Sequence, residues 1–221
     1  MKEQNEEKNI EVGGVIAKTQ EFFEKNKKTL IIVACAIVAV GLGIWAYIGL
    51  IANPRQVRAA EDMFAAEQYF GDGIFDQALE GNSDFLGFLD IIDEYGCTKS
   101  GNLAKLYAGI CEINLGRYKD AINHLDSYKA DDIFTKAIAK MLMGDAYAEL
   151  SDAANASKYY QKAATESDNV ITAPTALWKA GMMEIQLGNK AKAIELFQKI
   201  KDNYPESTEW NEVDKYIALA E

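Results

Sequence analysis

One spacing pattern recurs three times in the second half of the chain and constrains its fold more than any other feature. A small residue is followed seven residues later by Gly or Ser, five residues after that by Ala, and four residues later again by a large apolar side chain. The small residues of the three copies are Gly109, Gly144 and Gly181, which stand 35 and 37 residues apart. Repeats of this length are typical of stacked helical hairpins, because each hairpin needs its neighbours to bury its apolar face.

Each position of the pattern has a physical reason in a pair of antiparallel helices. The first small residue lets the two helices approach closely, and the Gly or Ser lies at the turn, where a left-handed residue ends many helices. The Ala packs against the preceding helix, and the large residue fills the gap between hairpins. The later positions of the three copies are Gly116, Ala121, Leu125, then Ser151, Ala156, Tyr160, and then Gly188, Ala193, Phe197. The pattern predicts an all-α array.

A weaker fourth copy precedes these three, and a further helix follows them. Ala66 takes the small position 43 residues before Gly109, so this copy holds about nine extra residues. We expect residues 81–92 to form either a lengthened second helix or an added turn. After Pro205, apolar residues in Glu209–Ala220 recur at three-and-four spacing, which suits a helix that covers the last apolar face. Residues 59–221 are therefore predicted to form four helical hairpins and a C-terminal capping helix.

Between Leu30 and Ala52 the chain carries no charged side chain for 23 residues. A helix of that length is about 35 Å long and can cross a hydrocarbon core of about 30 Å. The apolar run and its leading region are too long for a cleaved signal peptide, and no small-residue cleavage site follows. We predict a single retained transmembrane helix at residues 29–52, a cytoplasmic tail at 1–28 and a linker at 53–58, with Leu30–Ala52 in contact with the membrane.

The orientation of this helix follows from the positive charges that flank it. Four lysines lie within the twelve residues before Leu30 and two arginines within the six residues after Ala52; they are Lys18, Lys25, Lys27, Lys28, Arg55 and Arg58. Cytoplasmic flanks are enriched in Lys and Arg, so the N-terminus is predicted in the cytoplasm. The repeat domain then lies outside it, which in a bacterium with an inner and an outer membrane means the periplasm. The reverse topology, with the repeats in the cytosol, stays open.

Charge and motif content argue against several classes of function. The net charge is −11, and the acidic excess lies in residues 59–221, which disfavours binding to nucleic acid. The sequence contains no phosphate-binding loop, no dinucleotide fingerprint and none of the common zinc or serine hydrolase motifs. His124 is the only histidine, and we interpret it as a surface or hydrogen-bonded residue. Cys97 and Cys111 are expected to be free thiols, with a disulfide as the alternative. We predict no enzyme activity, cofactor or metal.

The small–Gly–Ala–aromatic–Pro pattern over residues 100–205 resembles the tetratricopeptide repeat family, whose unit has 34 residues. The resemblance implies a concave surface lined by the first helix of each hairpin, where a protein partner binds. Carried over by the matched glycines, the groove residues are Leu106, Ile110, Ile113, Met141, Asp145, Trp178, Met182 and Ile185. The Lys residues that hold a terminal carboxylate in some members do not match here. The groove either accepts an apolar or helical segment or is covered by the C-terminal helix or a neighbouring repeat.

The combined architecture resembles the bacterial YfgM-type inner-membrane proteins, which are associated with the Sec translocon and with periplasmic chaperones. This resemblance implies a non-enzymatic, membrane-anchored adaptor that binds protein partners or exported chains near the translocon. The alternative is a permanent structural subunit of a cell-envelope complex. The identity of the partner and the oligomeric state stay open.

Overall fold

The structure is a computed structural model that describes the backbone of residues 2–221 and the side chains of residues 24–221. The described residues form helices joined by turns, and their β pairing is limited to one isolated bridge between Gly81 and Leu86. The chain divides into two compact units, Met1–Pro54 and Arg55–Glu221. Each unit is described by itself.

The first unit consists of the long helix α1 (Lys2–Tyr47) and the π-helical turn η1 (Ile48–Ala52). Pro54 has no N–H to donate, and the Asn53 N–H bonds to the carbonyl of Ile48, five residues earlier, which gives the π turn. Large apolar side chains project outward here, and Trp45 is 75% exposed. Much of the predicted tail, residues 1–28, lies outside the described side chains. Helical residues Glu24–Gly71 are long and apolar enough to cross a membrane by length and composition.

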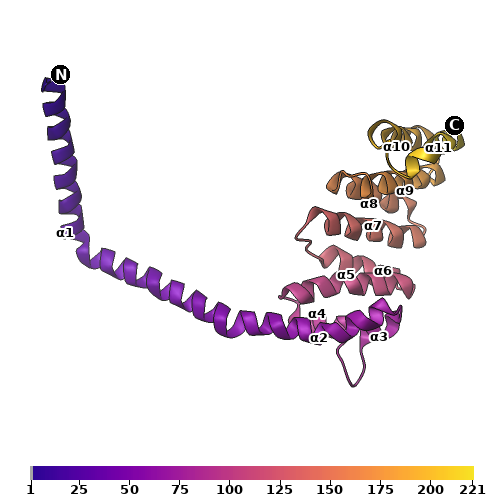
Figure 1. Ribbon diagram of the computed structural model, residues 1–221, viewed down its shortest axis with the longest axis horizontal. Coiled ribbons are helices and arrows are strands. Elements are labelled where there is room, and N and C mark those ends of the chain that lie inside the picture. Colours follow the sequence, from indigo (N-terminus) through magenta and orange to yellow (C-terminus); the bar gives the residue numbers. More distant parts are fainter. Residues whose placement is uncertain (1) are drawn as a thin grey trace. The chain divides into compact units, whose positions relative to one another are not determined.

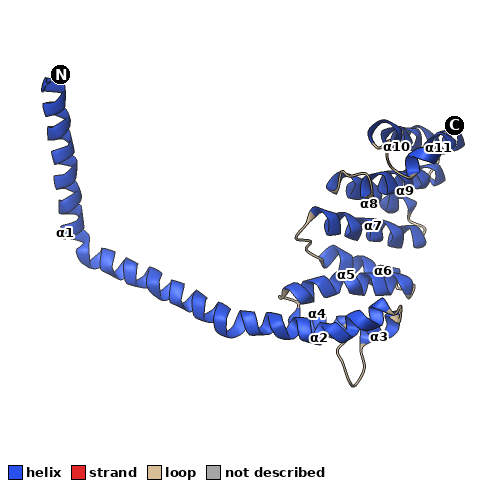
Figure 2. Cartoon of the chain, viewed as in Figure 1, coloured by secondary structure: helices blue, strands red, loops and turns tan. Residues whose placement is uncertain are grey.

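The second unit is an array of four helical hairpins followed by a capping segment (Figure 1, Figure 2). The first hairpin pairs α2 (Asn53–Gly71) with a second helix that is split into α3 (Phe75–Glu80) and α4 (Phe88–Tyr95). The next three pair α5 (Lys99–Asn114) with α6 (Tyr118–Ser127), α7 (Ile133–Glu149) with α8 (Ala153–Glu166), and α9 (Thr172–Gln186) with α10 (Lys190–Asn203). The 3₁₀ turn η2 (Glu209–Glu212) and α11 (Val213–Ala220) complete the array. The predicted all-α fold is confirmed.

The small residue of each repeat allows its two helices to meet. A Cβ atom on Gly144 would lie 2.5 Å from the ring of Tyr160, and one on Gly181 would lie 2.4 Å from the ring of Phe197. The large residue therefore packs onto the small residue of its own hairpin, a closer contact than the predicted filling of space between hairpins. The alanines at the third position, Ala121, Ala156 and Ala193, are fully buried.

The turn between the two helices of each hairpin contains one residue in the left-handed region. Gly73, Gly116 and Gly188 have φ angles of 75°, 74° and 76°, and Ser151 has 61°. This position lies seven residues after the small residue in all four hairpins, as the pattern predicts. Ser151 pays a steric penalty that the three glycines avoid, because its Cβ crowds the backbone in this region.

The extra residues of the first hairpin form an added turn rather than a lengthened helix. Residues 81–87 separate α3 from α4 and make a loop closed by the Gly81–Leu86 bridge (Figure 2). A Cβ on Gly81 would lie 2.4 Å from the backbone nitrogen of Gly87. The two ends of the loop can therefore approach this closely only because Gly81 has no side chain. Residues 53–58 lie within α2.

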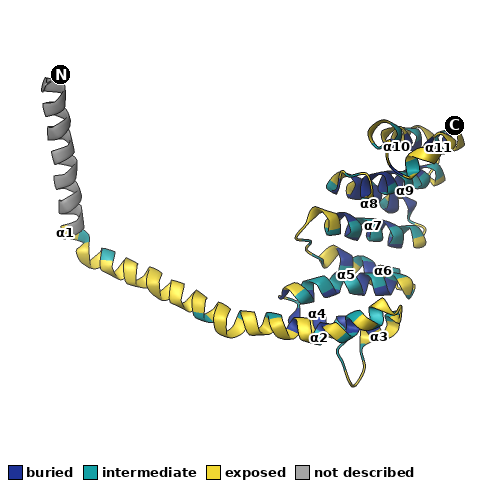
Figure 3. Ribbon diagram, in the orientation of Figure 1, coloured by how far each residue is buried: buried dark blue, intermediate teal, exposed yellow. Residues whose placement is uncertain are grey.

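Buried apolar side chains form three clusters along the array. The first joins α2, α3, α4 and α5, the second joins α5, α6 and α7, and the third joins α8 to α11. Many of the buried positions are alanines, which lets helices pack closely. Figure 3 shows buried and half-buried residues through α5, α7, α8 and α9.

Candidate functional site

The candidate site is the face that the first helices α5, α7 and α9 share. α7 packs against both α5 and α9 as well as against its own partner α8, so the three helices lie in succession. Ile110 and Ile113 on α5 pack half-buried against the cluster that contains Leu125 and Met143. We call this face the first-helix face. The predicted groove residues that are half-buried on these helices, besides Trp178, are Ile110, Ile113, Met141, Asp145, Met182 and Ile185.

One of the residues assigned to the groove by sequence, Leu106, offers a partner little surface. Leu106 is only 7% exposed and packs with Leu125, Ala139 and Met143 between α5, α6 and α7. Its side chain therefore belongs to the core of the array. Trp178 is half-buried, and the Tyr216 ring of the C-terminal helix α11 lies against it.

Asp145 is bound to other residues of the domain. Its carboxylate lies 2.6 Å from the Lys179 Nζ atom and accepts a hydrogen bond of 2.7 Å from the Tyr160 hydroxyl. Lys179 also stands over the Tyr160 ring, 5.5 Å from its centre. Burial, followed by the bond to Asp145, raises the pKa of Tyr160 far above its ordinary value. Asp145 is thus paired within the domain, with Lys179 from the next repeat and with Tyr160 of its own hairpin.

The C-terminal helix covers the last part of the first-helix face. The Tyr216 ring from α11 meets the Trp178 ring edge-on at 5.6 Å and lies 5.7 Å from the Phe197 ring. The indole Nε1 of Trp178 is buried and has no hydrogen-bond partner among the described residues. Of the two predicted states, an open groove and a covered one, the covered state holds at Trp178, while Ile110 and Ile113 on α5 lie away from α11.

Sequence analysis missed two buried carboxylates, each three residues after the small residue of its repeat. Glu112 lies 2.8 Å from the His124 Nδ1 atom. Glu184 accepts a hydrogen bond of 2.5 Å from Ser157 and lies 2.6 Å from the Lys192 Nζ atom. Burial by itself would raise the pKa of Glu184, but these bonds hold it below its ordinary value. Both carboxylates tie helices together. Their shared position, three residues after a repeat glycine, is a signal that the sequence does contain.

The cysteines lie in different environments. Cys97 is exposed in the turn before α5, and Cys111 is fully buried in the first core cluster. Both are free thiols, as expected. Burial, with the nearby Glu112 charge, raises the pKa of the Cys111 thiol to about 12, so that thiol stays protonated and unreactive.

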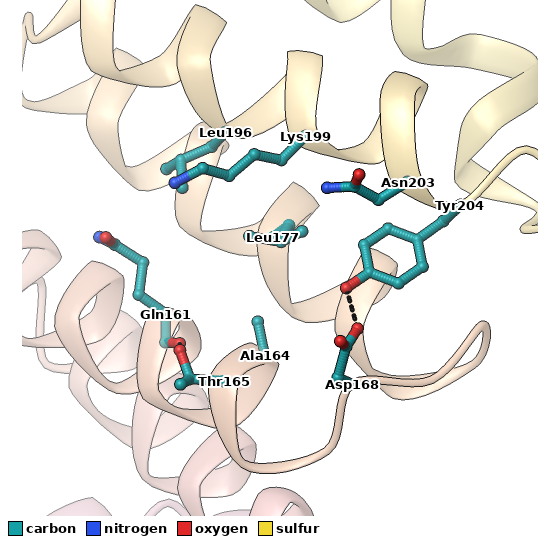
Figure 4. Close-up of a pocket in the computed structure, with 9 residues that line it drawn as sticks. All are labelled: Gln161, Ala164, Thr165, Asp168, Leu177, Leu196, Lys199, Asn203 and Tyr204. Atoms are coloured by element: carbon teal, nitrogen blue, oxygen red, sulfur yellow. Dashed lines mark hydrogen bonds between the residues drawn. The ribbon is translucent and has the colours of Figure 1, made fainter.

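A separate cleft of about 290 Å³ lies between α8, α9 and α10 (Figure 4). Asp168 accepts a hydrogen bond from the Tyr204 hydroxyl at one end of it (Figure 4). Burial, followed by that bond, raises the pKa of Tyr204 to about 12. The other side chains around the cleft are Gln161, Ala164, Thr165, Leu177, Leu196, Lys199 and Asn203. None of the predicted groove residues lines it.

Comparison with known proteins identifies the repeats. Tetratricopeptide repeat models match residues 137–169, which cover α8 and most of α7, and residues 175–207, which cover α10 and most of α9. These two hairpins carry tetratricopeptide repeats. Two crystal structures titled as MamA are similar, with TM-scores of 0.53 and identities of 21% and 20%. The match covers 73% and 70% of this chain and 80% and 91% of those chains, and at this identity it shows the fold alone. No curated protein matches the chain significantly.

Proposed function

We propose that the protein is a non-enzymatic, membrane-anchored adaptor whose repeat domain binds a segment of a partner protein. The single observation that carries this is the first-helix face. It presents Ile110, Ile113, Met141, Met182 and Ile185 half-buried on three successive helices. Arrays of this fold bind proteins through such faces, and methionine adapts its shape to different partners. Repeat scaffolds of this fold typically carry no catalytic activity.

The anchor in this proposal is the uncharged stretch Leu30–Ala52. Its side chains project outward from a helix in the described residues, and Leu50 is 78% exposed. Such a surface is stable in lipid and unstable in water, because exposed apolar area costs free energy only in water. We therefore place this stretch across a membrane, with contact to lipid along its length.

The finer parts of the proposal rest on the flanking charge and on architecture. The four lysines close before the span and the two arginines close after it favour a cytoplasmic N-terminus and a periplasmic repeat domain in the bacterial inner membrane. The resemblance to YfgM-type proteins adds the Sec translocon, or periplasmic chaperones, as the class of partner. In the alternative, the same face is filled by a fixed neighbour, and the protein is a permanent subunit of an envelope complex.

Co-purification from membranes in mild detergent tests the binding face. The double variant Ile110→Ala with Met182→Ala should lose its partner, because both side chains belong to the first-helix face. The control, Lys162→Ala with Lys199→Ala, changes exposed residues of α8 and α10 and should keep it. The single variant Met182→Ala should weaken binding. Met182→Leu, which conserves the side-chain volume, should retain it.

Three outcomes separate the alternatives. Loss of the partner at an unchanged melting temperature supports an adaptor face. A stoichiometric partner that resists high salt favours the permanent subunit. Equal recovery of the partner with the double variant Ile110→Ala with Met182→Ala and with the wild type contradicts the proposed face.

Thiol labelling tests the proposed topology. A membrane-impermeant maleimide should react with the exposed Cys97 in intact spheroplasts. The other two thiols should not react, because Cys111 is buried and Cys35 lies in the apolar helix. Cys97→Ala should abolish the reaction. Labelling of Cys97 only after lysis would contradict a periplasmic repeat domain.

A further inference from the structure

The second helices α8 and α10 line a groove that the proposed function does not use. Both helices contribute residues to the cleft of about 290 Å³ in Figure 4, and α9, which packs against each of them, lies at its floor. Ala164, Leu177 and Leu196 line the cleft although they are only 8%, 7% and 2% exposed, so the floor is apolar. The polar side chains stand around the rim, where a bound molecule would meet them.

A second hollow, of about 380 Å³, continues this cleft. Gln161 and Thr165 line both, so the two form one groove. The hollow adds further residues of α8 and one from the first turn of α10; they are Lys158, Lys162, Glu166 and Lys192. We call the cleft and the hollow together the lysine groove.

The residues that α10 contributes to the lysine groove share one face of that helix. They recur at spacings of four, three and four; they are Lys192, Leu196, Lys199 and Asn203. Gln198 of the same helix lines neither hollow. The eleven-residue step from Lys192 to Asn203 corresponds to about 16 Å along a helix. An extended segment of about five residues covers that length.

The rim of the lysine groove carries more positive than negative charge. Its four lysines are all exposed; they are Lys158, Lys162, Lys192 and Lys199. Two acids, Glu166 and Asp168, also line the groove. Glu166 already lies 2.7 Å from the Lys136 Nζ atom of α7, and Asp168 accepts a hydrogen bond from Tyr204. The positive excess is the reverse of the net charge of the whole chain, which is −11.

Two of these lysines have no acidic partner. Within residues 24–221, whose side chains the structure describes, no ion pair involves Lys158 or Lys162. Lys192 and Lys199, by contrast, each lie beside a glutamate carboxylate, at 2.6 Å and 2.8 Å. The unpaired positive charge of the groove therefore belongs to α8.

This charge indicates the kind of molecule that fits the groove. A carboxylate beside an unpaired lysine gains charge-assisted hydrogen bonds, and the side-chain amides of Gln161 and Asn203 can donate to the oxygens of an extended segment. A long polyanion such as a nucleic acid would also meet the acidic surface outside the groove, which repels it. A short acidic segment responds mainly to the groove, because exposed charges are screened beyond about 8 Å at physiological salt.

We propose that the lysine groove binds a short acidic segment of a second partner protein, with its carboxylates at Lys158 and Lys162 and an apolar side chain on the floor formed by Leu177 and Leu196. The predicted groove residues of the first-helix face line neither hollow, so each surface can hold its own partner. The inference goes beyond the proposed function, because it makes the repeat domain a bridge between two proteins. It does not depend on which partner binds the first-helix face.

Binding of a synthetic peptide tests the lysine groove. The full chain in detergent micelles is titrated into the rhodamine-labelled peptide Glu-Asp-Leu-Asp-Glu, and fluorescence anisotropy reports binding. Lys158→Glu with Lys162→Glu should weaken binding by about tenfold or more. The control, Lys119→Glu with Lys129→Glu, makes the same change in net charge at exposed residues outside the groove and should weaken binding by less than about threefold. Both variants should melt like the wild type.

Changes to the peptide locate the contacts without disturbing the core of the domain. A peptide with Gln and Asn in place of Glu and Asp should not bind, because it has no carboxylates for the lysines. A peptide with Asn in place of Leu should bind more weakly, because it leaves the apolar floor uncovered. The affinity of the acidic peptide should fall as the salt concentration rises. Lys162→Ala with Lys199→Ala should weaken peptide binding and still keep the partner of the first-helix face.

The opposite results overturn the inference in distinguishable ways. No binding of the acidic peptide, or equal weakening by the two lysine pairs, overturns the groove. Equal binding of the uncharged peptide overturns the recognition of carboxylates. Tighter binding of single-stranded RNA through the same lysines overturns the choice of a protein segment. Ile110→Ala with Met182→Ala should bind the peptide like the wild type, so a failure of the first-helix face is seen separately from a failure of the lysine groove.

Discussion

At the scale of single residues, the hairpins depend on the missing side chain of each repeat glycine. Gly144→Ala would place a Cβ 2.5 Å from the Tyr160 ring, which packing on the neighbouring helix prevents from moving freely. We expect it to lower the free energy of unfolding by about 1–3 kcal/mol. Gly71→Ala at the end of α2 meets no atom within 4 Å and should be neutral or slightly stabilising. Chemical denaturation measures both, and equal effects would contradict the packing argument.

Ser151 gives the opposite prediction, because it occupies a turn position that suits glycine. Its φ angle of 61° is strained for a residue with a Cβ. Ser151→Gly should therefore raise the free energy of unfolding by about 1 kcal/mol, and Gly188→Ala should lower it by a similar amount. Thermal melting of the two variants beside the wild type tests this. A lower melting temperature for Ser151→Gly would show that the turn is not left-handed.

His124 makes stability depend on pH. Its hydrogen bond to Glu112, reinforced by the charges of Glu112 and Asp120 and opposed by burial and Lys105, raises the pKa of His124 above its ordinary 6.5. A raised pKa means that the stabilisation is complete below the unfolded pKa and is lost as pH rises through the folded one. We expect the free energy of unfolding to be highest below pH 6.5 and to fall as the pH rises above it.

The control is His124→Gln, which keeps a polar group but cannot become charged. Its unfolding free energy should change little over the same range, because this is the only histidine of the chain. The lowered pKa values of Asp132 and Glu166 act in a more acidic range. An equal decline in the variant and the wild type would assign the pH dependence to other groups.

At the scale of elements, the capping helix is held by aromatic contacts. Tyr216→Ala removes its contacts with the Trp178 and Phe197 rings and should lower the free energy of unfolding by about 2 kcal/mol. It should also shift tryptophan emission to longer wavelength, because Trp178 would become hydrated. Leu219→Ala on the same helix, where the side chain is exposed, is the control. Similar losses from both variants would contradict the placement of α11.

Elements set by short-range rules are predictable from the sequence. The distance of 16 residues between Gly181 and Phe197 lies within one hairpin, and Asp132 caps α7 through N–H groups two and three residues later. The cover over Trp178 is not predictable in this way, because it depends on where α11 docks. The Asp145–Lys179 pair is predictable only in part. Its two residues stand one repeat apart in the sequence, but their contact depends on how the repeats stack.

At the scale of the whole molecule, we propose that the fold serves to hold a binding surface in place and not to carry out a chemical reaction. The sequence supplies a long apolar helix and tetratricopeptide repeats, and we propose a binding face on α5, α7 and α9. Which partner occupies the face depends on surfaces that belong to another molecule. The chain alone predicts the kind of contact, which is apolar and adaptable.

The most direct test is photocrosslinking in intact membranes. A photoreactive residue at Met182, on the first-helix face, should give one adduct of defined mass with a protein partner. The same residue at Gln198, exposed on α10, should give none. Adducts from Gln198 but not from Met182, in chains that melt like the wild type, would contradict the account.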